Sequence, residues 1–281
     1  MSTFAAVQKL YMIRQFFRFY WKATTLYQIH SPFVYELAQH ILEDQRWFYT
    51  FSQLRETRQR MRQDPRRLEV TDYGAGSKLL KNKSRAVAAI ARTSLSPPRT
   101  LHLLFRLINH LKPQKLLELG TSLGLSAFTQ SQASLNGQLI TLEGCPEIAK
   151  IARENFQRLK AQNIQLLEGP FSQSLPKALS QLEQLDYVFI DGHHAYEPTI
   201  QYFKQCLQYA HNTSVFVFDD LYWSAEMTAA WEAIKAHPKV RLSIDLFFIG
   251  LVFFREEQKT KKHYRLVPIH WKPWIMGFFR S

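Results

Sequence analysis

The chain of 281 residues is long enough for one large domain, or for one domain with a substantial extension. Its hydrophobic fraction of 46% supports a sizeable core, and no apolar run reaches the roughly 20 residues that would span a bilayer. The formal net charge of +13 favours anionic partners, which are nucleic acid, an acidic membrane surface or an acidic substrate.

The two cysteines, Cys145 and Cys206, have neither the spacing of a metal site nor that of a disulfide framework. Free thiols indicate a reducing compartment. Lys9, Arg14 and Arg18 interrupt the apolar residues of the N-terminus, so we expect no secretory signal peptide. The expected location is therefore cytoplasmic, with a peripheral position at the inner membrane surface as an option.

Residues 1–95 predict a helical N-terminal extension, which we expect to act as a substrate cap or as a membrane or dimer contact. In its first helix, residues 4–22, Arg14, Arg18 and Lys22 recur at four-residue spacing while aromatic side chains crowd other faces. Such a helix suits a membrane interface, and it equally suits packing on the main domain or on a second subunit of a homodimer. The tail at residues 270–280 is also aromatic and basic, so contact with a membrane through both segments is one expectation.

Two further helices and a glycine-rich loop follow in this extension. Ser31-Pro32 places a serine cap and a proline at the start of one helix, and an Arg- and Gln-rich helix should end near Asp64-Pro65. Asp72 to Ser77 has the Asp-x-Gly-x-Gly form of a nucleotide turn, but a weak strand precedes it and a charged stretch follows it. We expect a flexible loop there, with direct ligand contact as the alternative.

From Lys115 onward, short apolar runs alternate with segments of helical period. The expected strands are residues 115–119, 138–142, 164–168, 186–190 and 214–218. The expected helices are residues 124–133, 146–160, 172–181, 197–209 and 224–236. This alternation predicts a parallel sheet covered by helices on both faces. Residues 241–246 and 248–254 then lie so close together around Gly250 that this pair should be antiparallel.

A glycine turn ends the first of these strands. The segment from Lys115 to Ser126 is an apolar run that includes Glu118, turns through Gly120 and Gly124, and enters an apolar-periodic segment. Glycine lets a ligand approach the backbone closely, and the free N–H groups of a helix start can bind an anionic group. By itself the turn is compatible with several nucleotide-type ligands.

Acidic residues stand at the carboxyl end of every expected parallel strand, where open sheets of this kind bind ligands. In chain order they are Glu118, Glu143, Glu168, Asp191 and the pair Asp219-Asp220, and His193 and His194 follow Asp191. An acid at the second strand end can accept hydrogen bonds from the two hydroxyls of a ribose. The whole set suits a cationic cofactor, a divalent metal or proton transfer.

Together these motifs resemble a class I S-adenosylmethionine-dependent methyltransferase. The resemblance rests on the sequence Glu-Leu-Gly-Thr-Ser-Leu-Gly, on Glu143 and on the run from Phe189 to Tyr196. It is nearest to the catechol O-methyltransferase-like enzymes and to related uncharacterised bacterial methyltransferases. It implies an α/β fold with a Rossmann-like, seven-stranded, mostly parallel sheet whose last strand is antiparallel, in a domain of residues 96–281.

The resemblance implies a set of residues that bind S-adenosylmethionine. The methionine part would lie against the glycine turn, the ribose against the acid after the second strand, and the adenine near the end of the third strand. The residues assigned in this way are Glu118, Gly120, Thr121, Gly124, Ser126, Glu143, Gly169, Pro170, Phe171 and His193.

The resemblance also implies catalytic and metal-binding residues. Asp191, Asp219 and Asp220 match the three metal-ligand positions of the catechol-type enzymes, which suit a divalent ion such as Mg²⁺. Asp220 departs from the asparagine that is frequent in that family. His194 stands in place of the family's lysine base and fits as general base, because imidazole accepts a proton near neutral pH. Asp191 is assigned to catalysis as well.

The expected reaction is methylation of oxygen on a small-molecule or lipid-like acceptor, with Tyr222 and Trp223 beside the acceptor pocket. An RNA methyltransferase is one alternative, favoured by the basic clusters, although the extension contains no recognisable RNA-binding module. A membrane-surface binding protein that retains the cofactor fold without turnover is another. The identity of the acceptor does not follow from the sequence.

Overall fold

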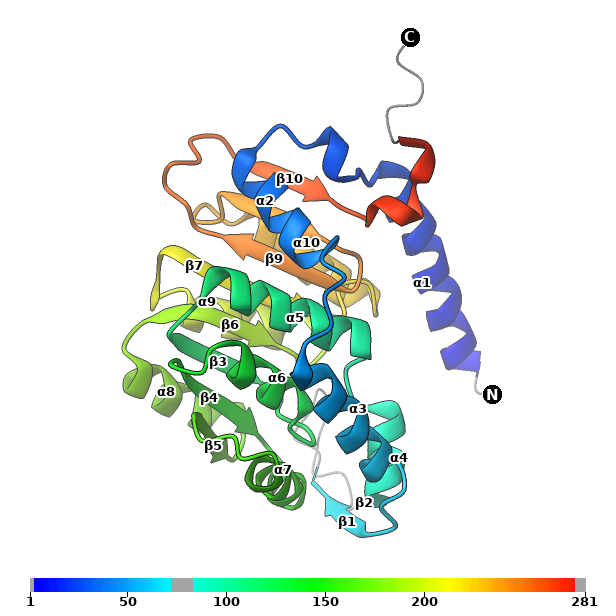
Figure 1. Ribbon diagram of the computed structural model, residues 1–281, viewed down its shortest axis with the longest axis vertical. Coiled ribbons are helices and arrows are strands. Elements are labelled where there is room, and N and C mark those ends of the chain that lie inside the picture. The colour runs from blue at the N-terminus through cyan, green and yellow to red at the C-terminus, as the bar shows by residue number, and fades with distance from the viewer. Residues whose placement is uncertain (1–2, 72–82, 276–281) are drawn as a thin grey trace. The chain divides into compact units, whose positions relative to one another are not determined.

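The computed structural model describes residues 3–71 and 83–275, and the glycine-rich loop predicted at Asp72 to Ser77 lies outside them. The chain divides into two compact units. The first unit combines residues 1–45 with residues 193–281, and the second unit is the continuous segment 46–192. Figure 1 labels most of the helices and strands of the two units.

The second unit contains parallel strands in the order β6-β3-β4-β5, joined by helices. Its strands are β3 (Lys115–Leu119), β4 (Gln138–Glu143), β5 (Ile164–Glu168) and β6 (Leu185–Ile190). Its connecting helices are α6 (Leu125–Ala133), α7 (Pro146–Arg158) and α8 (Phe171–Leu182). The predicted alternation of strands and helices is confirmed in this unit.

Long apolar runs explain why these strands form the core of the second unit. Leu117, Ile140 and Val188 are fully buried, as expected for parallel strands covered on both faces. Burying one such side chain contributes roughly 1.5–3 kcal/mol to stability. β5 is less buried, since it stands last in the strand order and has a single neighbour. The core therefore fixes the carboxyl ends of β3, β4 and β6 most firmly.

The first unit contains the antiparallel strands that the sequence predicted. Its strands are β7 (Ala210–Asp219), β8 (Leu242–Asp245), β9 (Ile249–Phe253) and β10 (Lys262–Arg265). β9 runs antiparallel to both β7 and β8, which confirms the reversed pair around Gly250. Its sheet helices are α9 (Tyr196–Cys206) and α10 (Ala225–Ala236). Gly250 lets the ring of Trp231 pack on β9, because a Cβ at this position would stand 2.6 Å from Cη2 of that ring.

Eight strands form a mostly parallel sheet in the order β10-β8-β9-β7-β6-β3-β4-β5, which corrects the expected number of seven. The additional strand is β10, which pairs in parallel with β8 and sets Lys262 opposite Leu242. Its sequence, Lys-His-Tyr-Arg, lacks an apolar face and gave no strand signal. An edge strand with one neighbour can be charged, because its outer side faces solvent.

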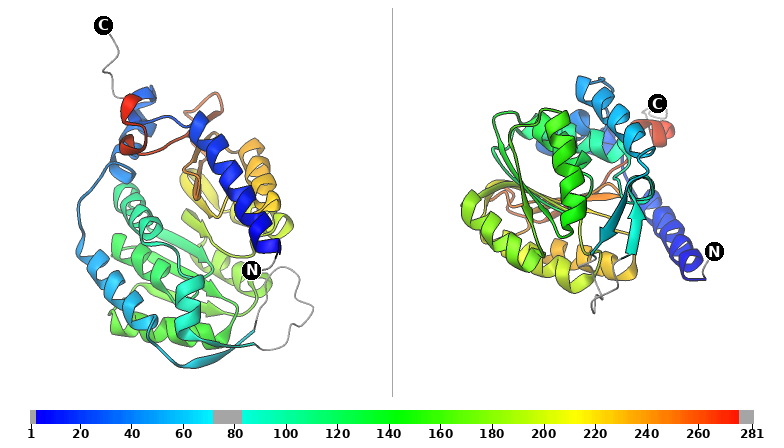
Figure 2. Two further views of the ribbon diagram at one scale, coloured as in Figure 1. Left: turned by 90° about the vertical axis from the view of Figure 1, so that its right-hand side faces the viewer. Right: turned by 90° about the horizontal axis from the view of Figure 1, so that it is seen from below.

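The predicted cationic helix at the N-terminus is confirmed as α1 (Thr3–Lys22), and it packs within the first unit. The Tyr11 hydroxyl donates to Thr228 Oγ1 on α10 at 2.9 Å, and the ring of Phe16 meets that of Phe247 edge-on at 5.1 Å. Figure 2 shows α1 alongside α10. The next helix, α2 (Pro32–Ile41), begins as expected, since Ser31 Oγ accepts from the Val34 N–H. No described helix is long and apolar enough to cross a membrane.

In the second unit, the segment before β3 combines helices with a short β-hairpin. Its described residues form α3 (Tyr49–Met61), α4 (Val87–Thr93) and α5 (Pro98–Leu111), and an antiparallel hairpin of β1 (Arg67–Val70) and β2 (Lys83–Ala86). The weak strand expected before Asp72 is β1. β2 is short and polar, so its pairing with β1, and not an apolar pattern, defines it. The hairpin lies beside α4 in Figure 1.

Candidate active site

The glycine turn after β3 is tightly packed in the second unit. Gly120 has φ +105° and Gly124 has φ +88°, both in the left-handed region that favours glycine. A Cβ at Gly120 would clash with the Asp191 carbonyl oxygen, and one at Gly124 would stand 2.7 Å from the Phe156 ring. The N–H of Gly120 donates to the Leu142 carbonyl at 3.1 Å. The turn therefore lies at the ends of β3, β4 and β6 together, as predicted.

Glu143 is held at the end of β4 by backbone amides. Its Oε2 accepts from the Ser122 N–H in the turn, and its Oε1 accepts from the Cys145 N–H, both at 2.9 Å. Burial raises the pKa of this carboxyl, and the backbone donors oppose that shift. The residue keeps partial exposure, and carboxylate oxygens have further lone pairs. The geometry thus leaves acceptor capacity for hydroxyls of a ligand.

Glu118, predicted to hold the methionine part of the cofactor, is fully buried beneath the turn. Its carboxylate accepts from Gln130 Nε2 at 2.6 Å and from Thr141 Oγ1 at 2.5 Å. Thr141 also lies 2.6 Å from Thr121 Oγ1, which connects Glu118 to the turn, and Ser126 makes a further hydrogen bond to Glu118. Burial raises the pKa of Glu118 to about 7.

The end of β5 borders open space. Gly169 has φ +116°, its N–H donates to the Glu143 carbonyl at 2.9 Å, and no heavy atom would lie within 4 Å of a Cβ there. Pro170 precedes α8 and accepts from Ser174. The ring of Phe171 packs against Gly192, where a Cβ would approach it to 2.7 Å. The residues predicted to border the adenine therefore lie in the same unit as Glu143.

Asp191 directly follows β6 in the second unit. Its N–H donates to the Leu119 carbonyl at 2.9 Å, and its Oδ2 accepts from Ser96 Oγ at 3.4 Å. Of the other two predicted metal ligands, Asp219 is the last residue of β7 in the first unit, and Asp220 follows it. Asp219 is buried, whereas Asp220 is partly exposed.

His194, the predicted base, pairs with Asp220 in the first unit. Nδ1 of His194 lies 3.8 Å from Oδ2 of Asp220, and about a third of each side chain is exposed (34% and 36%). Burial raises the pKa of Asp220, and the charge of His194 acts in the opposite direction. Asp220 has φ +55°, a conformation that is uncommon outside glycine, asparagine and aspartate. The strained turn places a carboxylate next to an imidazole, which is an arrangement suited to proton transfer.

The remaining predicted residues of the first unit have identifiable partners. The His193 ring nitrogen Nδ1 lies 3.1 Å from the Tyr202 hydroxyl. The Tyr222 hydroxyl donates to Asp245 Oδ2 at 2.5 Å, so it is already engaged, while Trp223 is 41% exposed. The sequence analysis did not identify Asp245, the partner of Tyr222, or Gln130 and Thr141, two partners of Glu118. Aligning the two predicted strands could have identified Thr141, because Thr141 stands opposite Glu118 on the adjacent strand.

The segment that contains these residues is similar in sequence to known proteins. Residues 117–221 match the family model described as a methyltransferase domain. Over 158 residues the chain is 29% identical to a catechol O-methyltransferase of Niastella koreensis, across 54% of this chain and 69% of that one. Over 113 residues it is 30% identical to a catechol O-methyltransferase of Mycobacterium tuberculosis, across 40% of this chain and 50% of that one.

These comparisons support a class I S-adenosylmethionine-dependent methyltransferase domain of the catechol O-methyltransferase-like group. The fold agrees with this assignment. The crystal structure of the O-methyltransferase from Bacillus cereus in complex with SAH is similar with a TM-score of 0.53 at 20% identity, across 78% of this chain and 96% of that one. The matched segment of the methyltransferase domain includes every predicted cofactor and metal residue, and Tyr222 and Trp223 follow it directly.

Glu118 makes the stability of the methyltransferase domain dependent on pH. Its folded pKa of about 7 exceeds the ordinary value of 4.5, so the folded state holds the proton more tightly. The corresponding stability is present below pH 4.5 and is lost as the pH rises through 7, a change of about 3 kcal/mol. We expect Glu118→Gln, which keeps the shape without the titration, to remove this loss. Urea unfolding at pH 5 and pH 8 measures it.

The control is Glu147→Gln, which changes an exposed carboxylate on α7. This variant should keep the pH dependence of the wild type. Equal free energies of unfolding at both pH values in the wild-type protein would contradict the assignment to Glu118.

Proposed function

We propose that the protein transfers a methyl group from S-adenosylmethionine to a hydroxyl oxygen of a small or lipid-like acceptor. The observation that carries the proposal is the Glu143 carboxylate, held by two backbone amides next to a glycine turn and still partly exposed. A carboxylate in this place is suited to paired hydroxyls of a ribose. The catechol O-methyltransferases named above support oxygen as the methylated atom.

The residues of the second unit fit the cofactor. The space beside Gly169 admits a flat base bordered by Pro170 and Phe171, and Glu143 offers acceptors for the ribose. The buried Glu118 favours a cationic group at the turn, since desolvation of a carboxylate is relieved by a nearby positive charge. When bound, S-adenosylmethionine supplies a methyl group on a sulfonium that is open to attack. The chain's task is then to hold the acceptor oxygen in line with that methyl group.

His194 is the proposed general base of the reaction. Its imidazole accepts the proton of the acceptor hydroxyl, and Asp220 at 3.8 Å stabilises the imidazolium that forms. The burial that raises the pKa of Asp220 also makes a nearby cation favourable. His193 contributes on the adenine side in this proposal, with its ring oriented by Tyr202.

A divalent metal ion is a second means of activating the hydroxyl. Asp191, Asp219 and Asp220 offer oxygen donors, which Mg²⁺ prefers, and the desolvated Asp220 carboxylate would be relieved by a bound cation. A bound ion would lower the pKa of the acceptor hydroxyl and orient it.

Removal of the ribose acceptor should weaken cofactor binding. Glu143→Ala removes the two proposed hydrogen bonds from the ribose hydroxyls to the carboxylate, each worth about 1.5 kcal/mol or more. The dissociation constant for S-adenosylmethionine should therefore rise at least tenfold. Calorimetry measures the affinity, and transfer of labelled methyl from S-adenosylmethionine into fractionated cell extract measures the activity. Glu147→Ala on the exposed side of α7 is the control. Unchanged affinity in Glu143→Ala would contradict the ribose assignment.

The two means of activation are separable in one assay. If His194 is the base, His194→Ala should lower turnover by roughly 10²-fold or more while affinity for S-adenosylmethionine stays unchanged. If a metal acts, chelator should abolish the activity, and Asp219→Asn should do so without chelator. His30→Ala, an exposed change in the same unit, is the control. Turnover that resists both His194→Ala and chelator would contradict both roles.

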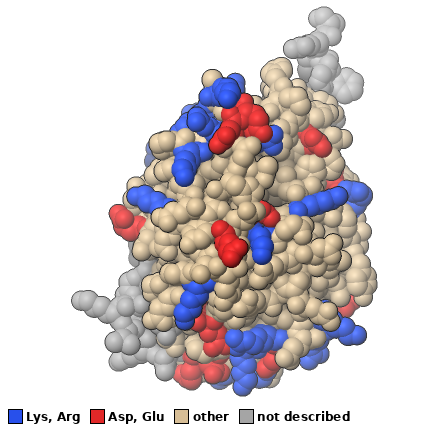
Figure 3. Space-filling model, turned by 90° about the vertical axis from the view of Figure 1, so that its left-hand side faces the viewer, with Lys and Arg blue, Asp and Glu red and all other residues tan. Residues whose placement is uncertain are grey.

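An RNA acceptor is less favoured, because arginines of the basic cluster at residues 55–67 have partners within the chain. Arg60 donates to Asn155 at 2.8 Å, and Arg66 pairs with Asp64 and Glu154 at 2.7 and 2.8 Å. The face drawn in Figure 3 intersperses Lys and Arg with Asp and Glu over much uncharged surface. A nucleic-acid site is typically one contiguous basic patch.

Contact of α1 with an anionic membrane surface is part of the proposal. One face of the helix is apolar and exposed, formed by Val7, Leu10, Ile13, Phe17 and Trp21. Their spacing keeps them on one side of the helix, away from the buried Phe19. The helix has four cations and no acid, which complements anionic lipid. Trp271 packs on Phe16, and nearby in the chain Trp274 is 61% exposed, which adds a second interfacial aromatic.

Loss of two exposed aromatic side chains should release the protein from vesicles. Phe17→Ser with Trp21→Ser should reduce co-sedimentation with phosphatidylglycerol vesicles at least tenfold, because burying each ring contributes roughly 1.5–3 kcal/mol. Leu135→Ser, an exposed apolar residue of the second unit, is the control. The membrane proposal would be wrong if the wild-type protein did not bind these vesicles. If the wild type instead formed a dimer that dissociated in the double variant, the apolar face of α1 would bind a second copy of the chain.

A further inference from the structure

A cavity of about 670 Å³ lies within the first unit. α1 forms one side of it, α10 another, and the end of β10 and the turn before α10 complete it. The charged and polar residues that line it include Arg18, Lys22, Tyr222, Thr228, Glu232 and Arg265. Its volume is in the range of small-molecule sites.

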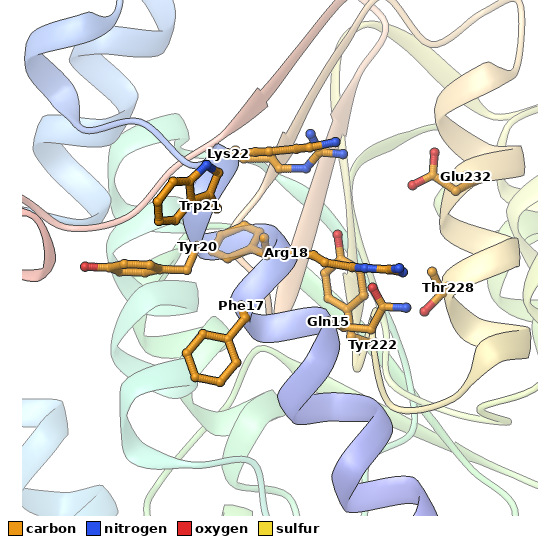
Figure 4. A pocket seen from close by; sticks show the side chains of 11 residues that line it. Gln15, Phe17, Arg18, Tyr20, Trp21, Lys22, Tyr222, Thr228 and Glu232 are labelled. Atoms are coloured by element: carbon orange, nitrogen blue, oxygen red, sulfur yellow. The ribbon is translucent and has the colours of Figure 1, made fainter.

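Side chains of α1 divide into two groups at this cavity. Gln15 and Arg18 extend toward Tyr222 and the α10 side chains, whereas Phe17 and Trp21 point to the other side of the helix (Figure 4). Gln15 and Arg18 therefore extend into the cavity, and Phe17 and Trp21 also border it, although their side chains point to the other side of the helix.

The cavity has an excess of positive charge. Glu232 accepts from Lys235 Nζ at 2.7 Å, and Arg265 Nε lies 3.9 Å from the buried Asp245. Those two lining charges thus have counterions outside the cavity lining. Arg18 and Lys22 form no ion pair with any residue in the described part of the chain. Two exposed cations that converge on one hollow suit an oxyanion.

The cavity is close to the proposed catalytic pair. Tyr222, which lines it, follows Asp220 by two residues, so their Cα atoms are at most about 7.6 Å apart. Asp220 in turn lies 3.8 Å from His194. Tyr222 is held in place by Asp245 and by stacking on Phe247 at 5.0 Å. A small molecule with its charged group in the cavity can therefore present a hydroxyl toward Asp220 and His194.

We propose that this cavity binds the oxyanion, a phosphate or carboxylate, of an amphiphilic acceptor, and that Arg18 and Lys22 hold that group. The guanidinium of Arg18 can bind two oxyanion oxygens at once, and Lys22 adds a second positive charge. Thr228 and the aromatic wall of Tyr222 border the less polar part of the ligand. This inference rests on the proposed function, because the ligand is the molecule that is methylated.

The test measures binding of hexyl phosphate to the full-length protein by calorimetry. Wild-type protein should bind it, and Arg18→Gln with Lys22→Gln should weaken the binding at least tenfold. The matched control is Lys9→Gln with Arg14→Gln, which removes two exposed cations of α1 that do not line the cavity. Equal weakening by the control, or no binding to the wild type, would overturn the proposal.

Two further arms identify the ligand. Hexyl glucoside, which has the same chain without the charge, should bind more weakly than hexyl phosphate, and so should inorganic phosphate. If inorganic phosphate bound as tightly as hexyl phosphate, the proposal of an amphiphilic ligand would be wrong, and the cavity would bind a free anion. Hexyl phosphate should also compete with the labelled fraction in the methyl-transfer assay, and a lack of competition at saturation would exclude the acceptor role.

Affinity for S-adenosylmethionine separates this inference from the function on which it rests. The Arg18 and Lys22 double variant should bind S-adenosylmethionine as the wild type does, which also shows that it is folded. Failure of the wild type to bind S-adenosylmethionine would contradict the proposed function. The hexyl phosphate titration tests separately whether the cavity binds an amphiphilic anion.

Discussion

Contact between the backbone of Gly120 and the Asp191 carbonyl is the constraint on which the cofactor side of the site depends. A side chain at Gly120 would collide with that carbonyl, so only glycine allows the end of β3 to lie this close to the end of β6. The Asp191 N–H fixes the same contact through the Leu119 carbonyl. The turn then directs the Ser122 N–H to Glu143, which positions the proposed ribose acceptor. One close backbone approach therefore aligns three strand ends.

Each of the two units holds carboxylates that burial has desolvated. Burial raises the pKa of Glu118, Glu143 and Asp220, and hydrogen-bond donors or a neighbouring histidine oppose that shift. Such carboxylates are stabilised by a cation more than exposed ones are, because water screens them less. A chain with a net charge of +13 thus presents acids at its sheet edge. This favours a cationic cofactor over a pyrophosphate-containing one.

The cationic and the exposed apolar side chains of α1, which alternate in the sequence, point to different sides of the helix. Arg18 contributes to a cationic cavity shared with α10, while Phe17 and Trp21 remain on an exposed apolar face. An acceptor with both an anionic group and an apolar part would suit the cavity, and a membrane surface would suit the apolar face. The two proposals are tested by substitutions of different side chains of one helix.

The sequence alone determined the alternation of strands and helices, the reversed strand pair and the glycine turn, because each depends on local period or on the conformational freedom of glycine. The Glu118 position was identified, but its buried bond to Thr141 required the register of two adjacent strands. The charged β10 and the polar β2 became strands only through their partners. Likewise the cationic cavity joins Arg18 to Glu232 and Arg265 across more than two hundred residues, and only tertiary packing brings such distant side chains together.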